Sequence, residues 1–312
     1  MATTPTPPPV PQPHAAAAPQ PSPKRGMHPR ATLAILILAC LFVFMPFLFW
    51  RASWFGAPMT AQEITEALAP GAEPRKIQHA LAQLSSRMDR SDPAARQWYP
   101  AVIAEAKHPD SQIRLTAAWV MGRDNSAPEF HQALLPLLAD PDPMVRVNAA
   151  LSLVRFADSS GRPQLVALLQ PYTVLAPPSD HLVDGFSGGT LRQRLKVGDA
   201  VRPGTMVARL IVSWHEQVSA PEEVKEVRSP VPGILVRWLQ PTGATVLGSQ
   251  PLCILSPDPQ SAWEALRALY LIGQPDDIPI IESFLRTSSD LPPNVAEQAR
   301  LTLAEIRKRA GP

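Results

Sequence analysis

The chain has 312 residues, with 29 Lys and Arg against 27 Asp and Glu, and only two cysteines. This near-neutral charge excludes the strongly basic surface typical of nucleic-acid-binding proteins, so no nucleic-acid partner is expected. Two cysteines exclude a disulfide scaffold and a zinc site of four thiolates. The 38 prolines are over twice the average usage, which indicates that part of the chain does not form a packed core.

Proline supplies ten of residues 1–30, and the rest are mostly Ala, Thr and Gln. Because proline removes backbone donors and fixes φ, and large apolar residues are scarce, we expect a disordered tail with polyproline II character.

Residues 31–50 form an uncharged apolar run bracketed by Arg30 and Arg51. At about 1.5 Å per residue, a helix of this length spans about 30 Å, which predicts a single transmembrane helix. Lys24, Arg25 and Arg30 precede the run, whereas Arg51 alone follows it before Arg75. This asymmetry predicts a bacterial inner-membrane protein with a cytoplasmic N-terminus and with residues 51–312 in the periplasm.

Two later segments repeat with an offset of 32 residues: HPDSQIRLTAAWV from His108 and DPDPMVRVNAALS from Asp140. A Pro-Asp turn starts each helix, and an alanine pair permits close packing against a neighbour. An amphipathic helix over 127–139 separates them. Further helices are expected over 60–69, 74–90, 94–106, 276–287 and 293–309. Thr60 to Glu63 predicts a capping box at the first.

These segments resemble HEAT repeats, which implies helix pairs stacked into an α-solenoid over residues 58–171 and again over 258–312. Asp258-Pro259 is aligned with Asp140-Pro141, and an offset of 118 places Leu271 opposite Leu153. The repeats are also similar to the HEAT-like modules of bilin lyases, without a set of residues to transfer.

Residues 172–257 have the glycine and β-branched spacing of short strands and turns. Gly198-Asp-x-Val201-x-x-Gly204 is paralleled 45 residues later by Gly243 and Val246, with Ala244 in place of the aspartate and Ser249 in place of the last glycine. With Ser229-Pro-x-x-Gly233, this pattern resembles the biotinyl/lipoyl domain, a barrel-sandwich hybrid that membrane-fusion (periplasmic adaptor) proteins also contain. The resemblance implies a small all-β domain inserted in one interhelical turn.

In biotin and lipoyl carriers, the modified lysine occupies a hairpin tip. Counting from Gly233 or from Gly198 places that tip at Glu222 or at Trp214, and an amide-linked arm needs a primary amine, which neither provides. Lys225 is nearby but off the tip. We therefore expect no cofactor and a longer, unmodified hairpin near 213–226. Trp214, His215 and Glu222 are its candidate partner-binding residues.

No catalytic or metal site is predicted. Ser187 fits G-x-S-x-G but precedes a β segment rather than a helix. The histidines lack metal-binding spacing, and Cys253 lies among apolar residues, as an inert core thiol does.

The sequence thus predicts a multidomain, non-enzymatic scaffold or adaptor: a transmembrane helix, an α-solenoid and an inserted β domain. It would bind protein partners of an envelope complex through the solenoid's concave face and the hairpin. The alternatives are a membrane-fusion subunit of an export system, or a biotin or lipoyl carrier modified on Lys225.

Overall fold

The computed structural model describes residues 33, 35–42, 44–45, 58–178, 188–212, 223–288 and 291–311. The chain divides into two units, residues 1–57 and residues 58–312. In the first unit the described residues are helical and exposed. Among the described residues, no helix is long and apolar enough to cross a bilayer. The predicted tail over 1–30 and the other residues of the predicted run 31–50 lie outside this description.

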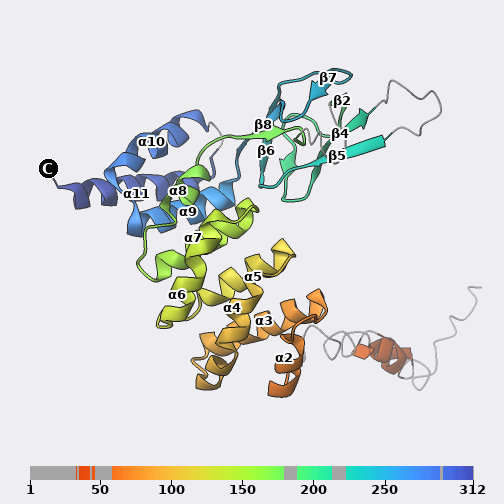
Figure 1. The fold of residues 1–312 in the computed structure, drawn as a ribbon, viewed down its shortest axis with the longest axis vertical. Helices are drawn as coiled ribbons and strands as arrows, with labels where there is room; N and C mark the ends of the chain where they lie inside the picture. The colour runs from red at the N-terminus through yellow and green to blue at the C-terminus, as the bar shows by residue number, and fades with distance from the viewer. Residues whose placement is uncertain are drawn as a thin grey trace, which may run out of the picture. The chain divides into compact units, whose positions relative to one another are not determined.

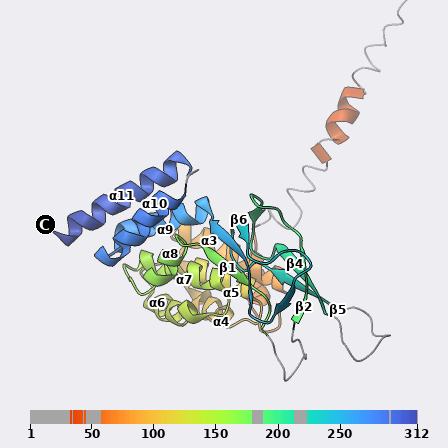
Figure 2. The same cartoon turned by 90° about the horizontal axis from the view of Figure 1, so that it is seen from above.

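The second unit contains an array of helix pairs, visible in Figure 1 from α2 to α11. The second helices of the pairs, α3, α5, α7, α9 and α11, each pack against the next, which confirms the helical repeats. Figure 2 shows α10 and α11 running side by side at the C-terminal end. The helical elements are α2 (Ala61–Ala67), α3 (Pro74–Asp89), η1 (Pro93–Trp98), α4 (Tyr99–Glu105), α5 (Ser111–Met121), α6 (Pro128–Leu134), η2 (Leu135–Ala139), α7 (Pro143–Arg155), α8 (Arg162–Ala167), α9 (Pro259–Ile272), η3 (Pro275–Asp277), α10 (Ile278–Thr287) and α11 (Pro293–Ala310).

Short polar side chains determine where these helices begin. Thr60 and Glu63 form the predicted capping box at α2, with both reciprocal hydrogen bonds present. Asp110, Asp142 and Asp258 each accept a backbone N–H in the first turn of α5, α7 and α9. A carboxylate at this position satisfies an otherwise unpaired donor, which is worth about 1 kcal/mol.

Two helices predicted as continuous are each divided into a 3-10 turn and an α-helix. The predicted helix over 94–106 is split between η1 and α4, and that over 127–139 between α6 and η2. The breaks coincide with Pro100 and Pro136, which have no backbone N–H to continue the helical bonding. Phe130, Leu134 and Leu137 are nevertheless buried, so the apolar face of the second segment was correctly predicted.

The alignment of α9 with α7 differs from the prediction by two residues. Asp258 caps α9 as Asp142, not Asp140, caps α7, so the structural offset is 116. With this offset Leu269 corresponds to Leu153 and both are buried, whereas Leu271 is 61 % exposed. The error arose because the sequence Asp-Pro-Asp-Pro at 140–143 offers two Asp-Pro matches, and the helix begins after the second.

Between α8 and α9 the chain forms two antiparallel four-stranded sheets, ordered β1-β8-β6-β3 and β5-β4-β2-β7. Since α8 packs against α9, the strands occupy a connection within one helix pair. Side chains from both sheets, including Leu191, Leu210, Leu235 and Leu255, form one shared core. The strands are β1 (Tyr172–Leu175), β2 (Gly188–Gln193), β3 (Ala200–Val201), β4 (Met206–Val212), β5 (Glu223–Arg228), β6 (Gly233–Trp238), β7 (Thr245–Leu247) and β8 (Pro251–Pro257).

The two halves of this β region pair in the same way. Strand β2 pairs with β4 and β7, and strand β6 pairs with β8 and β3. Gly198 and Gly243, 45 residues apart, have φ of 96° and 87°. Gly204 has φ of 82°, and Ser249 at the equivalent position has φ of 62°. The serine that departs from the glycine pattern therefore keeps the left-handed backbone that the pattern demands.

Candidate functional site

The residues predicted to bind a partner at the hairpin, Trp214, His215 and Glu222, lie outside the described residues. The strands that flank them, β4 and β5, pair as far as Val212 and Glu223. Lys225 lies within β5, opposite Leu210, and so belongs to the paired strands rather than to the tip. Ser187 also lies outside the described residues.

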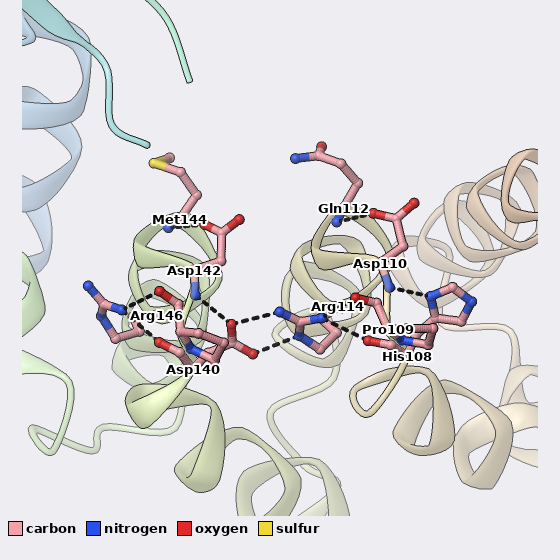
Figure 3. A network of polar contacts seen from close by, with 10 residues as sticks. His108, Pro109, Asp110, Gln112, Arg114, Asp140, Asp142, Met144 and Arg146 are labelled. Carbon is pink, nitrogen blue, oxygen red and sulfur yellow. Dashed lines mark hydrogen bonds and ion pairs between the residues drawn. The ribbon is translucent and has the colours of Figure 1, made fainter. Parts of the chain in front are cut away.

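The repeated Pro-Asp turns are joined by an arginine–aspartate ladder, formed by Arg114, Asp140 and Arg146 (Figure 3). The guanidinium of Arg114 donates to both carboxylate oxygens of Asp140, at 2.7 Å and 2.9 Å. The backbone N–H of Asp142 donates to the same carboxylate at 2.8 Å. Arg114 and Arg146 each donate through Nη1 to two carbonyl oxygens of the turn before their own helix.

The ladder has a structural role, because its hydrogen-bond donors and acceptors pair with one another. Burial alone would raise the pKa of Asp140, but the hydrogen bonds from Arg114 and Asp142 and the arginine charges outweigh it and lower that pKa. The hydrogen bond to Asp140 is also the main reason that the pKa of Arg114 is raised. Both side chains are mostly buried, with 13 % of Arg114 and 5 % of Asp140 exposed.

The ladder does not continue into α9. With the offset of 116, the position of Asp140 corresponds to Ser256, which lies in β8. Within the described part of the chain, Arg146 forms no ion pair of the kind that Arg114 makes. The inserted β region therefore occupies the place of the turn that would supply the next arginine–aspartate pair.

A groove with a volume of about 640 Å³ crosses the second helices of three successive pairs. We call it the α5–α7–α9 groove. Its lining residues recur at helical spacing, as in Asn148, Leu151 and Arg155 on α7. The cap-based alignment places Arg123 and Arg155 at equivalent positions on neighbouring helices. The groove is thus built from the same face of consecutive repeats.

Two arginines in the groove stack on tryptophans four residues earlier: Arg123, in the turn that follows α5, stacks on Trp119, and Arg267 stacks on Trp263 within α9. The guanidinium carbon of Arg123 lies 4.1 Å from the ring centroid of Trp119, and that of Arg267 lies 4.7 Å from Trp263. In α9 the four-residue spacing brings the two side chains together on one helix face, and the turn after α5 keeps Arg123 over Trp119 in the same way. Stacking fixes the plane of the guanidinium while leaving its N–H edge available for a ligand.

Small residues at the floor of the groove, Gly122 and Ser152, allow α5 and α7 to pack closely together. A Cβ at Gly122 would lie 2.5 Å from the Ser152 hydroxyl oxygen, so only glycine allows α5 and α7 to approach this closely. The Ser152 hydroxyl donates to the carbonyl oxygen of Ala118 at 2.8 Å, which ties the two helices at the same level. The spacing of the arginines on α5 and α7 is therefore set by direct contact.

The groove has an excess of positive charge. Its described lining contains three arginines, Arg123, Arg155 and Arg267, and one acidic residue, Glu264. Arg123 lies 3.6 Å from Asp89, and its enclosed Nε has no hydrogen-bond acceptor. Among the described residues, no ion pair involves Arg155 or Arg267. The guanidinium groups of Arg155 and Arg267 are therefore available to an external acceptor, whereas Arg123 already faces Asp89.

Within the described ranges, no group of His, Cys, Asp and Glu could hold a metal ion. Cys253, in the core of the β region, is fully buried, and burial raises the pKa of its thiol to about 11. That thiol stays protonated at neutral pH, so it lacks the thiolate character of a reactive cysteine.

Residues 99–174 match the family model of HEAT repeats. The matched segment runs from α4 to β1 and includes the arginine–aspartate ladder together with the α5 and α7 walls of the groove. The comparison with curated proteins finds no match for the chain. The repeats were predicted from the sequence, but the groove was not. Its signal, Trp and Arg four residues apart on two helices, was present in the sequence.

Proposed function

We propose that this protein is a non-enzymatic scaffold that binds a protein partner in the α5–α7–α9 groove. HEAT repeats generally act as protein-interaction modules, and the match at residues 99–174 covers two of the three groove helices. The observation that carries the proposal is the groove itself. It combines a volume of about 640 Å³ with exposed Trp119 and Leu271, and such exposed apolar and aromatic side chains are typical of interaction surfaces.

The scaffold would be anchored in the inner membrane by residues 31–50, with residues 51–312 in the periplasm. The support for this part is the uncharged apolar run and the excess of Lys and Arg before it. A cysteine introduced at Leu271, labelled with a membrane-impermeant maleimide, tests the topology. Labelling of cells with a permeabilised outer membrane and an intact inner membrane supports a periplasmic groove. Labelling only after the inner membrane is lysed refutes it.

The β region supports a second candidate, a membrane-fusion subunit of an export system. Its two halves pair equivalently, and its glycine pattern resembles the biotinyl/lipoyl domain that such subunits contain. A ring-like oligomer of the purified full-length chain, seen by mass photometry, would favour this candidate, and a monomer would exclude it. A carrier function on Lys225 is excluded if the intact mass equals that of the unmodified chain.

Photo-crosslinking in cells tests the scaffold directly. A photoreactive residue at Leu271, inside the groove and 61 % exposed, is expected to yield a defined adduct with one partner. The matched control is Leu301 on α11, which is 50 % exposed and lies outside the groove lining. Adducts that are identical at both positions, or absent at Leu271, would refute groove binding.

A further inference from the structure

We propose that the α5–α7–α9 groove recognises an acidic segment of the partner, bound in extended conformation across the three helices. This inference rests on the proposed function and specifies the chemistry of its ligand. The described lining holds three guanidinium groups and one carboxylate; Arg123 is paired with Asp89 beside the groove, and Arg155 and Arg267 form no ion pair with a described residue, so the groove complements a segment of Asp and Glu residues.

A carboxylate is the ligand that best satisfies the arginines of this groove. A guanidinium stacked on a tryptophan ring cannot approach an acceptor through its face, but its N–H edge matches the two oxygens of a carboxylate. The same chain shows the geometry, because Arg114 donates to both oxygens of Asp140 at 2.7 Å and 2.9 Å. In the groove, Arg155 and Arg267 form no ion pair with any described residue, which leaves them for the ligand.

The spacing of the helices determines the length of the segment. Packed helices lie about 8–10 Å apart, so the path from α5 over α7 to α9 is about 16–20 Å long. An extended chain rises about 3.3 Å per residue, and about six residues therefore cross the groove. Arg123 and Arg155 occupy equivalent positions on adjacent helices, which places their two carboxylates about two or three residues apart.

Apolar side chains between the acidic ones would complete the ligand. Trp119 is 39 % exposed and Leu271 is 61 % exposed, and both line the groove. Burial of such surface contributes about 25 cal/mol per Å². A segment with leucines between glutamates fits the groove better than an unbroken run of acidic residues.

The position of Leu271 offers a gain-of-binding test. With the structural offset of 116, Leu271 corresponds to Arg155, which in turn corresponds to Arg123. The substitution Leu271→Arg therefore completes a row of three arginines at the C-terminal ends of α5, α7 and α9. If carboxylates bind along this row, the variant binds an acidic segment more tightly than the natural chain does.

The experiment measures fluorescence anisotropy with the full-length chain in detergent micelles. The probe is a fluorescein-labelled hexapeptide, Glu-Leu-Glu-Glu-Leu-Glu, compared with its Gln-for-Glu counterpart. We expect the Glu peptide to bind and the Gln peptide to bind at least about tenfold more weakly. Arg155→Gln combined with Arg267→Gln should weaken binding about tenfold or more, and Leu271→Arg should strengthen it several-fold. Far-UV circular dichroism and melting curves check that each variant is folded.

The matched control is Arg300→Gln, an exposed arginine on α11 outside the groove lining, which should leave the affinity unchanged. Equal binding of the two peptides overturns the proposal, as does an equal effect of Arg300→Gln and the groove substitutions. Tighter arginine-dependent binding of a single-stranded oligonucleotide than of the Glu peptide also overturns it. If the Leu271 adduct forms in cells but the Glu peptide fails to bind, only the acidic specificity is refuted.

Discussion

Removal of the Asp140 carboxylate should destabilise the helix pairs on both sides of it. In Asp140→Ala, the mostly buried guanidinium of Arg114 loses two charge-assisted hydrogen bonds, and the N–H of Asp142 loses its acceptor. Truncation of one partner of a buried ion pair typically costs about 3–5 kcal/mol. Because Arg114 is 13 % exposed and keeps its bonds to two carbonyl oxygens, we expect the lower end, about 3 kcal/mol.

The control for this substitution is Asp142→Ala, which removes the same charge from the same turn. Asp142 caps α7 by accepting from the N–H of Met144 and makes no ion pair with Arg114. Loss of such a cap costs about 1 kcal/mol. A double-mutant cycle with Arg114→Met then isolates the pair, and the cost of the double variant should fall below the sum of the single ones.

Hydrogen–deuterium exchange of the α5 and α7 amides is the assay of choice, because repeat arrays open locally as well as globally. Asp140→Ala should raise their exchange rates far more than Asp142→Ala does. The pKa of Asp140 is lowered in the folded protein, so its contribution is present above the unfolded pKa and is lost as the pH falls through the folded value. The difference from the natural chain should therefore shrink below about pH 4. Equal costs for the two substitutions, or additivity in the cycle, would refute the reasoning.

Three further substitutions test the packing and the backbone. Glu105→Gln should raise the melting temperature at pH 7 but not near pH 4, because burial raises the pKa of Glu105 and makes its ionised form unfavourable in the folded protein; a lower melting temperature at pH 7 contradicts this. Gly122→Ala should cost about 1–3 kcal/mol in urea unfolding, since its Cβ would lie 2.5 Å from the Ser152 hydroxyl, and Ser152→Gly should recover part of the loss. Ser249→Gly should stabilise the β region by about 0.5–1 kcal/mol in the same assay, because φ is 62° there; no gain would show that the serine is not strained.

The repeats could be predicted from the sequence because their signals are local. A capping aspartate, a proline in the first turn and an alanine pair act within a few residues, so the order of the helices and most of their faces followed from them. The continuous helices over 94–106 and 127–139 were predicted wrongly, because Pro100 and Pro136 interrupt otherwise continuous apolar patterns, and the alignment of α9 was wrong because two adjacent Asp-Pro pairs match Asp258-Pro259. Burial distinguishes the two alignments of α9, because Leu269 is buried, like Leu153, whereas Leu271 is exposed.

The groove could not be predicted in the same way. Trp119 and Arg123 are four residues apart at the C-terminal end of α5, and their stacking was accessible from this spacing. Whether Arg155 and Arg267 join them depends on how α5, α7 and α9 assemble, including the close approach at Gly122, and sequence periodicity alone does not give that assembly. The hairpin residues Trp214, His215 and Glu222 remain predictions.

The β region enters and leaves the array through two strands that pair with each other, with Tyr172 opposite Leu255. A segment whose two ends meet can be exchanged for a tight turn without moving the helices that it joins. The same property would allow the segment to be transplanted as one unit into another connection of the same kind. The pair found at Arg114 and Asp140 is absent at Ser256 for the same reason, because strand β8 occupies the place of the turn that supplies Asp140 in the preceding repeat.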